Sequence, residues 1–74
     1  KIDPTFAEAY NNRGIAFRNL GQYERAMDEH DKAIALDPEY GFAWYNRGLA
    51  YDGLGSTGER DRSYQKASEL GYTP

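Results

Sequence analysis

The side chains that could carry catalytic or metal chemistry are few in this sequence, and they are not grouped for it. The chain has one histidine, His30, and no cysteine, which excludes thiolate metal sites and cysteine nucleophiles. Asp28, Glu29 and Asp31 lie next to His30, but they lack the glycine-containing loop spacing of a calcium site. No spacing suggests a nucleophile with its base. An enzyme is therefore the least favoured interpretation, and we expect neither a metal nor a cofactor.

The sequence contains the residue pattern of a phosphate-binding motif, but not the strand and helix around it that such a motif needs. Gly53, Gly55 and Gly58 spell G-x-G-x-x-G, which binds a dinucleotide when it follows a strand and opens the helix of a βα unit. Here the motif follows a helical pattern, and Gly55 lies where a turn is expected. We therefore interpret these glycines as part of a junction between helices.

Charge and hydropathy exclude two further classes of partner. Lys and Arg number 9 against 12 Asp and Glu, for a net charge of −3, whereas binding to nucleic-acid phosphates needs clustered basic residues. The apolar runs are a few residues long, far short of the ~20 needed to span a bilayer. We expect no nucleic acid and no membrane insertion. The lack of cysteine and of a signal-peptide pattern favours the cytoplasm.

The elements that must position any site come from an internal repeat. At an offset of 34 residues the chain matches itself, which is the signature of a repeat architecture. The matching pairs are Asp3-Pro4 with Asp37-Pro38, Asn12-Arg13-Gly14 with Asn46-Arg47-Gly48, and Leu20-Gly21 with Leu54-Gly55. We therefore predict one domain over 1–74 with repeats at 7–40 and 41–74, and residues 1–6 as the remnant of an upstream repeat.

Each repeat is predicted to form two helices. Apolar and glycine positions recur at helical spacing in both first halves: Tyr10, Gly14, Phe17 and Leu20, and then Trp44, Gly48, Tyr51 and Leu54. Gly21 and Gly55 end these helices as residues free to take positive φ, and Pro38 separates the repeats. Ser56 and Glu59 have capping-box spacing, and Gly71 ends the last helix. No stretch alternates as a strand would, so the fold class is all-α, with about four helices in tandem antiparallel hairpins.

These positions resemble the tetratricopeptide repeat (TPR) family. The family's pattern of aromatic, glycine, alanine and proline residues falls on Tyr10, Gly14, Phe17, Gly21, Ala26, Ala33 and Pro38, and on Trp44, Gly48, Tyr51, Gly55 and Ala67. The resemblance implies a solenoid whose first helices line a concave face that binds protein or peptide. Thr57, Arg60 and Tyr72 depart from the pattern, at the places of Tyr23, Ala26 and Pro38. Because small residues let helices approach closely, Arg60 predicts looser packing or a reoriented last helix.

The predicted binding face comprises the non-packing residues of the first helices. Phe42, Tyr45 and Leu49 form a second apolar stripe that nothing else in the chain obviously covers. The resemblance implies that Asn12 and Asn46 hydrogen-bond a bound peptide backbone, because an amide offers both a donor and an acceptor. The lysines that clamp a chaperone's terminal carboxylate are absent. The full set is Asn11, Asn12, Ile15, Arg18, Asn19, Phe42, Tyr45, Asn46, Leu49 and Asp52.

Several alternatives stay open at this point. The chain is either a peptide-binding scaffold or a homo-oligomerisation module, because its first helix lacks an upstream helix and leaves the N-terminal end open. Phe42 and Tyr45 either bind a ligand or make internal or self-contacts. His30 is expected to pack, since it occupies the position of Tyr64. Arg13 and Arg47 are expected to pair with a carboxylate such as Glu29, with anion binding as the alternative.

Overall fold

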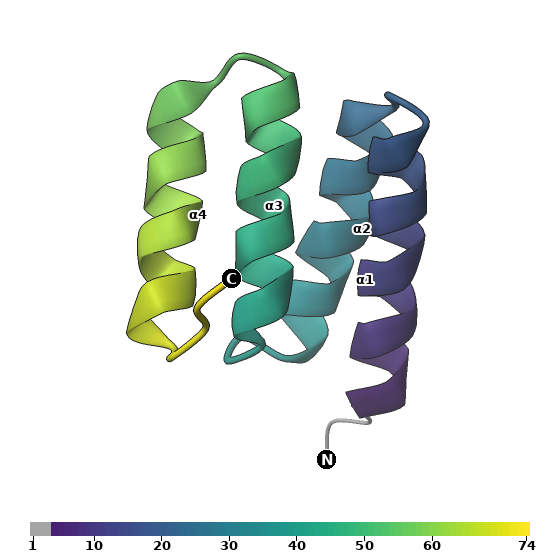
Figure 1. The fold of residues 1–74 in the computed structure, drawn as a ribbon. Coiled ribbons are helices and arrows are strands. Elements are labelled where there is room, and N and C mark those ends of the chain that lie inside the picture. Colours follow the sequence, from purple (N-terminus) through teal and green to yellow (C-terminus); the bar gives the residue numbers. More distant parts are fainter. Residues whose placement is uncertain (1–3) are drawn as a thin grey trace.

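The computed structural model describes residues 4–74 as four helices in two antiparallel hairpins. They are α1 (Pro4–Asn19), α2 (Tyr23–Leu36), α3 (Gly41–Gly53) and α4 (Thr57–Glu69). Figure 1 shows the α1–α2 hairpin beside the α3–α4 hairpin, with α3 between α2 and α4. No strand occurs in the described residues, so the all-α prediction is confirmed. Of the proposed upstream remnant, residues 4–6 form the first turn of α1, and Lys1–Asp3 lie outside the described part.

The predicted turn glycines are confirmed, whereas the capping box is wrong in its bonding. Gly21 and Gly55 both have φ of 78°, and Gly71 has φ of 88°, a region that glycine enters without steric cost. Ser56 is the N-cap residue of α4, but its side chain makes no capping hydrogen bond. Glu59 instead pairs with Arg62 at 2.9 Å. None of the described helices is long and apolar enough to cross a bilayer.

Each hairpin closes where a glycine of one helix meets an aromatic ring of the other. A Cβ atom on Gly14 would lie 2.6 Å from Cε1 of His30, and one on Gly48 would lie 2.5 Å from Cε1 of Tyr64. His30 is therefore a packing residue at the position of Tyr64, as predicted. The Arg60 carbonyl lies only 3.2 Å from that position at Gly48, so looser packing at Arg60 is wrong, whereas the alternative of a reoriented last helix stays a prediction.

The side chain of Arg60 explains how a large residue is accommodated there. Its guanidinium lies away from the hairpin interior, where Nη1 donates to Asp52 at 2.8 Å and Nε donates to Asp61 at 3.0 Å. The backbone of Arg60 therefore packs close to Gly48, while its charged group stays at the surface and pairs there with Asp52 of α3.

The core consists mainly of alanines, because the helices approach so closely. Ala26, Met27 and Ala50 form one buried cluster, with Phe17 and Tyr51 packed against it. Leu20 and Leu54 are 70% and 42% exposed, so the prediction that they continue the packing stripe is wrong. Each directly follows the last residue of a first helix and precedes the turn glycine. Phe17 and Tyr51, three residues earlier, still pack against the core, so interior packing ends at the hairpin connection itself.

Candidate functional site

Two residues of the predicted apolar stripe of α3, Phe42 and Tyr45, lie in an aromatic cluster with Tyr40, Tyr64 and Tyr72. Tyr45 stacks on Tyr64 of α4 with ring centroids 5.2 Å apart. Tyr72 follows α4, and its ring lies 5.3 Å from that of Tyr45 and 5.4 Å from that of Phe42. The expectation that nothing in the chain covers this stripe is therefore wrong for Phe42 and Tyr45, which make the internal contacts of the alternative interpretation, and it stays untested for Leu49. The signal for this cover in the sequence is the tyrosine at position 72, where the family pattern has proline.

The backbone after α4 brings Tyr72 back onto α3. At Gly71, with φ of 88°, the chain reverses, and the Tyr72 amide donates to the Ala67 carbonyl at 3.0 Å, as in a helix-ending glycine motif. Gly41 leaves the space that Tyr72 needs, because a Cβ atom there would lie 2.9 Å from the Tyr72 Cβ. Tyr72 can therefore lie against α3 because Gly71 allows the turn and Gly41 leaves room for its side chain.

A hollow of about 390 Å³ lies beside these rings, and we call it the tail hollow. It is lined by Tyr45, Tyr64, Ala67, Ser68, Tyr72, Thr73 and Pro74. No Lys, Arg, Asp or Glu side chain is among these residues. Burial raises the pKa of Tyr64, and the nearby Tyr45 and Asp52 raise it further. The phenol therefore stays protonated at neutral pH, and the hollow offers aromatic faces and hydroxyl groups.

Two of the predicted contact residues, Asn11 and Asn46, are buried inside the fold. Their exposed fractions are 0% and 2%, and Asn46 Nδ2 donates to Asn11 Oδ1 at 3.3 Å. The expectation that both side chains face an open groove is corrected, because this pair lies where α1 and α3 meet. Asn12, the repeat equivalent of Asn46, is exposed, since no described helix lies on that side of α1.

The other predicted residues of the first helices keep partial or full contact with solvent. Ile15, Arg18 and Leu49 are half-buried, whereas Asn19 and Asp52 are exposed. Ile15 and Leu49 are equivalent by the 34-residue offset. Arg18 and Asp52 are equivalent too, so one repeat presents a cation where the other presents an anion. The Nε atom of Arg18 is buried and has no hydrogen-bond partner within residues 4–74.

Arg13 and Arg47 both make the carboxylate pairs that were predicted for them. Arg13 lies 2.9 Å from Glu29, whose side chain is only 8% exposed. Arg47 lies 2.9 Å from Asp31, and its guanidinium lies over the rings of Trp44 and Tyr51 at 5.4 and 5.2 Å. Both arginines therefore tie neighbouring helices together.

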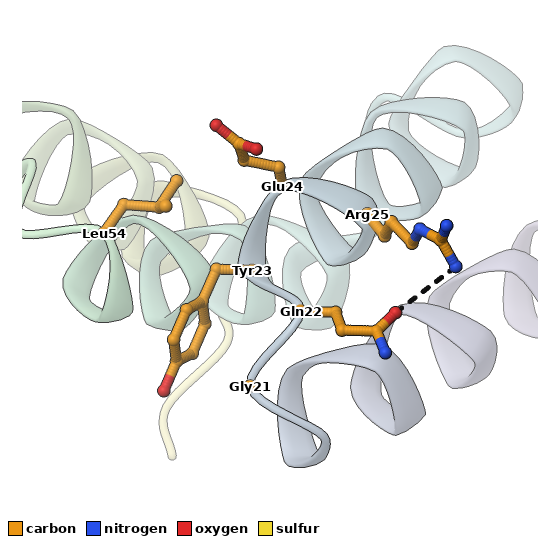
Figure 2. Close-up of a pocket in the computed structure, with 6 residues that line it drawn as sticks. All are labelled: Gly21, Gln22, Tyr23, Glu24, Arg25 and Leu54. Carbon is orange, nitrogen blue, oxygen red and sulfur yellow. Dashed lines mark hydrogen bonds between the residues drawn. The ribbon is translucent and has the colours of Figure 1, made fainter.

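A second hollow, of about 390 Å³, lies at the hairpin turns (Figure 2) and was not anticipated from the sequence. It is lined by Gly21, Gln22, Tyr23, Glu24, Arg25 and Leu54. Arg25 donates to Gln22 at 3.4 Å, and Figure 2 shows that the side chains diverge instead of meeting at one point. This arrangement brings no set of polar groups onto a common ligand atom.

The structure places His30, the one histidine, in the core as a packing residue. No cluster of three His, Cys, Asp or Glu residues suited to a metal occurs among the described residues. His30 is fully buried, and its two ring nitrogens have no hydrogen-bond partner within that part of the chain. Burial, followed by the charge of Arg18, lowers the pKa of His30 to about 4.

Comparison with known proteins agrees with this architecture. Tetratricopeptide repeat profiles match residues 7–40 and 43–70. A crystal structure of MamA is similar with a TM-score of 0.84 and 30% sequence identity, over 89% of this chain and 39% of that one. A second structure, of MamA protein, gives a TM-score of 0.82 and 31% identity, over 88% and 36%.

This chain thus spans well under half the length of the MamA chains that it matches. No curated protein sequence matches it. Proteins with these repeats generally act as non-catalytic scaffolds for protein–protein interaction. The chain belongs to the tetratricopeptide repeat family and forms a helical scaffold of two such repeats.

Proposed function

We propose that this scaffold binds a segment of a partner protein along the face shared by α1 and α3. The observation that carries the proposal is the pair Ile15 and Leu49. These aliphatic side chains occupy equivalent positions on the two first helices, and both are left half-buried. Phe42 and Tyr45 lie on the same helix as Leu49 and add only the parts of their rings that Tyr72 leaves uncovered. Covering ~300 Å² of such surface would contribute roughly 7 kcal/mol before ordering costs, which is enough for a peptide complex.

In the proposed site, polar residues beside this apolar strip orient the bound segment of the partner. Arg18 is half-buried and its Nε is enclosed, so a carbonyl or carboxylate of the ligand would be bound through the Nη groups of its guanidinium. At the equivalent position on α3, the Asp52 carboxylate is paired with Arg60 at 2.8 Å, so this position presents an ion pair and not a free anion. Asn12 and Asn19 are exposed, and their amides can each bond both a donor and an acceptor of a peptide.

The experiment compares two leucine-to-lysine substitutions in a peptide-array screen followed by fluorescence titration. Leu49→Lys places a charge on the proposed face, whereas Leu20→Lys makes the same change at a residue that is 70% exposed at the hairpin turn. We expect Leu49→Lys to weaken binding of the selected peptides at least about tenfold, the equivalent of about 1.4 kcal/mol. Leu20→Lys should leave binding unchanged. Equal effects of the two substitutions, with both variants folded by circular dichroism, would rule out this face.

A further inference from the structure

Two helix faces that the repeat makes equivalent have different surroundings in this molecule. On α3, Ala43, Asn46 and Ala50 share one face and are 0%, 2% and 0% exposed. Their equivalents on α1 are Ala9, Asn12 and Ala16, and all three are exposed. The first helix therefore presents to solvent the same face that the third helix uses for docking.

The surface that receives α3 inside the molecule also has an equivalent. Asn11 accepts the hydrogen bond of Asn46, and Ala33 of α2 is fully buried. The 34-residue offset carries these positions to Tyr45 and Ala67, which line the tail hollow. By the repeat, the tail hollow is the place where a further first-type helix would lie against the second hairpin.

Tyr72 occupies that place in this chain. In the first repeat the backbone continues through Asp37, which has φ of −143°, into α3. In the second repeat the equivalent residue is Gly71, whose positive φ turns the chain back, and the ring of Tyr72 covers Phe42 and Tyr45.

We propose that the tail hollow is a docking site for α1 of a second copy of this chain, and that Tyr72 closes it. The complementary face is exposed on every copy, and the contact repeats the α1–α3 contact already present inside the molecule. Because the two surfaces differ, association is head-to-tail and continues to higher oligomers instead of stopping at a dimer. This interaction involves the ends of the helix stack, so it goes beyond the peptide binding proposed for the face of α1 and α3.

The composition of α4 explains why one side chain can control this contact. Thr57 and Asp61 stand where the first repeat has Tyr23 and Met27, so the outer part of the receiving surface is polar. The apolar part of that surface, at Tyr45, Tyr64 and Ala67, is the part beside Tyr72. Since burial of apolar area drives association, the ring of Tyr72 covers the area that a second copy would need.

The test is sedimentation equilibrium of the full chain from about 10 µM to about 1 mM, a range that detects contacts of low affinity. Wild type and Tyr72→Phe should remain monomeric. Tyr72→Ala should show an average mass that rises with concentration past that of a dimer, and adding Ala16→Glu should return it to a monomer. A Tyr72→Ala variant that is folded and still monomeric at the highest concentration would overturn the proposal.

A second measurement applies even if Tyr72→Ala does not fold. The wild-type chain has no cysteine. When an Ala16→Cys chain is mixed with a Ser68→Cys chain, a disulfide that joins the two different variants can therefore link only residues 16 and 68, and it is measured apart from the disulfides that join identical variants. Because a disulfide accumulates even from brief docking while Tyr72 is displaced, mild oxidation in the otherwise wild-type background should trap this pair in several-fold higher yield than Ala16→Cys with Ser56→Cys. Equal yields from the two pairs would contradict docking at the tail hollow.

Discussion

At the scale of single residues, His30 shows how a polar side chain can serve as core. Its ring fills the space left by Gly14, and its nitrogens have no hydrogen-bond partner among residues 4–74. A charged imidazole would be desolvated there and would lie near the positive charge of Arg18. Both effects favour the neutral ring and lower the pKa of His30 to about 4.

This lowered pKa predicts a pH dependence of stability. The unfolded chain binds a proton at the ordinary His30 pKa of 6.5, but the folded chain binds it only near pH 4. Stability from the neutral ring is therefore fully present above pH 6.5 and falls as the pH is lowered toward 4, by up to about 3 kcal/mol. Urea unfolding of wild type and His30→Tyr across this range measures the effect.

The control follows from the repeat, because Tyr64 occupies the equivalent position. His30→Tyr keeps all the carboxylates of the protein, so their titration cancels when the two chains are compared. The free energy of unfolding should fall more steeply with acidification in wild type than in His30→Tyr. Parallel pH profiles would show that His30 does not titrate as its burial implies.

At the scale of the helices, pairing depends on glycine at the two crossing points. Gly14 and Gly48 lie within close contact of His30 and Tyr64, and this approach buries small residues such as Ala26 and Ala67. A larger side chain at either glycine must push the helices apart. Helix propensity alone would favour alanine over glycine by about 1 kcal/mol, so packing outweighs propensity here.

We therefore expect Gly14→Ala to lower the free energy of unfolding by about 1–3 kcal/mol through overpacking against the ring of His30. Gly58→Ala is the matched control, because a Cβ atom there meets only Nη2 of Arg62, at 4.0 Å. That substitution should raise stability by up to about 1 kcal/mol. Thermal and urea unfolding would contradict the argument if both alanines stabilised the protein.

At the scale of the whole molecule, α3 joins the two hairpins. Ala50 packs with Ala26 and Met27 of α2, Asn46 bonds to Asn11 of α1, and the Trp44 indole donates to the Pro38 carbonyl at 2.9 Å. Arg47 pairs with Asp31 across the same boundary. These contacts couple the hairpins, so they should unfold together.

The repeat supplies a matched pair of substitutions at this scale. Ala50→Leu inserts a larger side chain into the contact between hairpins, and we expect it to destabilise the protein by about 1–3 kcal/mol. Ala16→Leu makes the same change at the equivalent but exposed residue, where an effect within about 0.5 kcal/mol is expected. Similar losses in urea unfolding for both variants would indicate that the α1 face is covered in solution.

Much of the architecture could be predicted because it follows from local chemistry. The helices, their turn glycines and the packing roles of His30 and Arg13 follow from helical spacing, from positive φ at glycine and from comparison of one repeat with the other. The capping bond at Ser56 and the packing of Leu20 were predicted wrongly, because both depend on which neighbour competes for a side chain or reaches it.

By itself, the sequence determined that the chain forms two similar helix hairpins, since periodicity and glycine placement act within a few residues. Only the tertiary structure decided which equivalent residues are covered. Asn46 and Asn12 both begin an Asn-Arg-Gly sequence, yet one is buried against α1 and the other faces solvent. The fold of Tyr72 onto α3 was decided in the same way. Burial depends on which elements lie beside a helix, and residues far apart in the chain supply those neighbours.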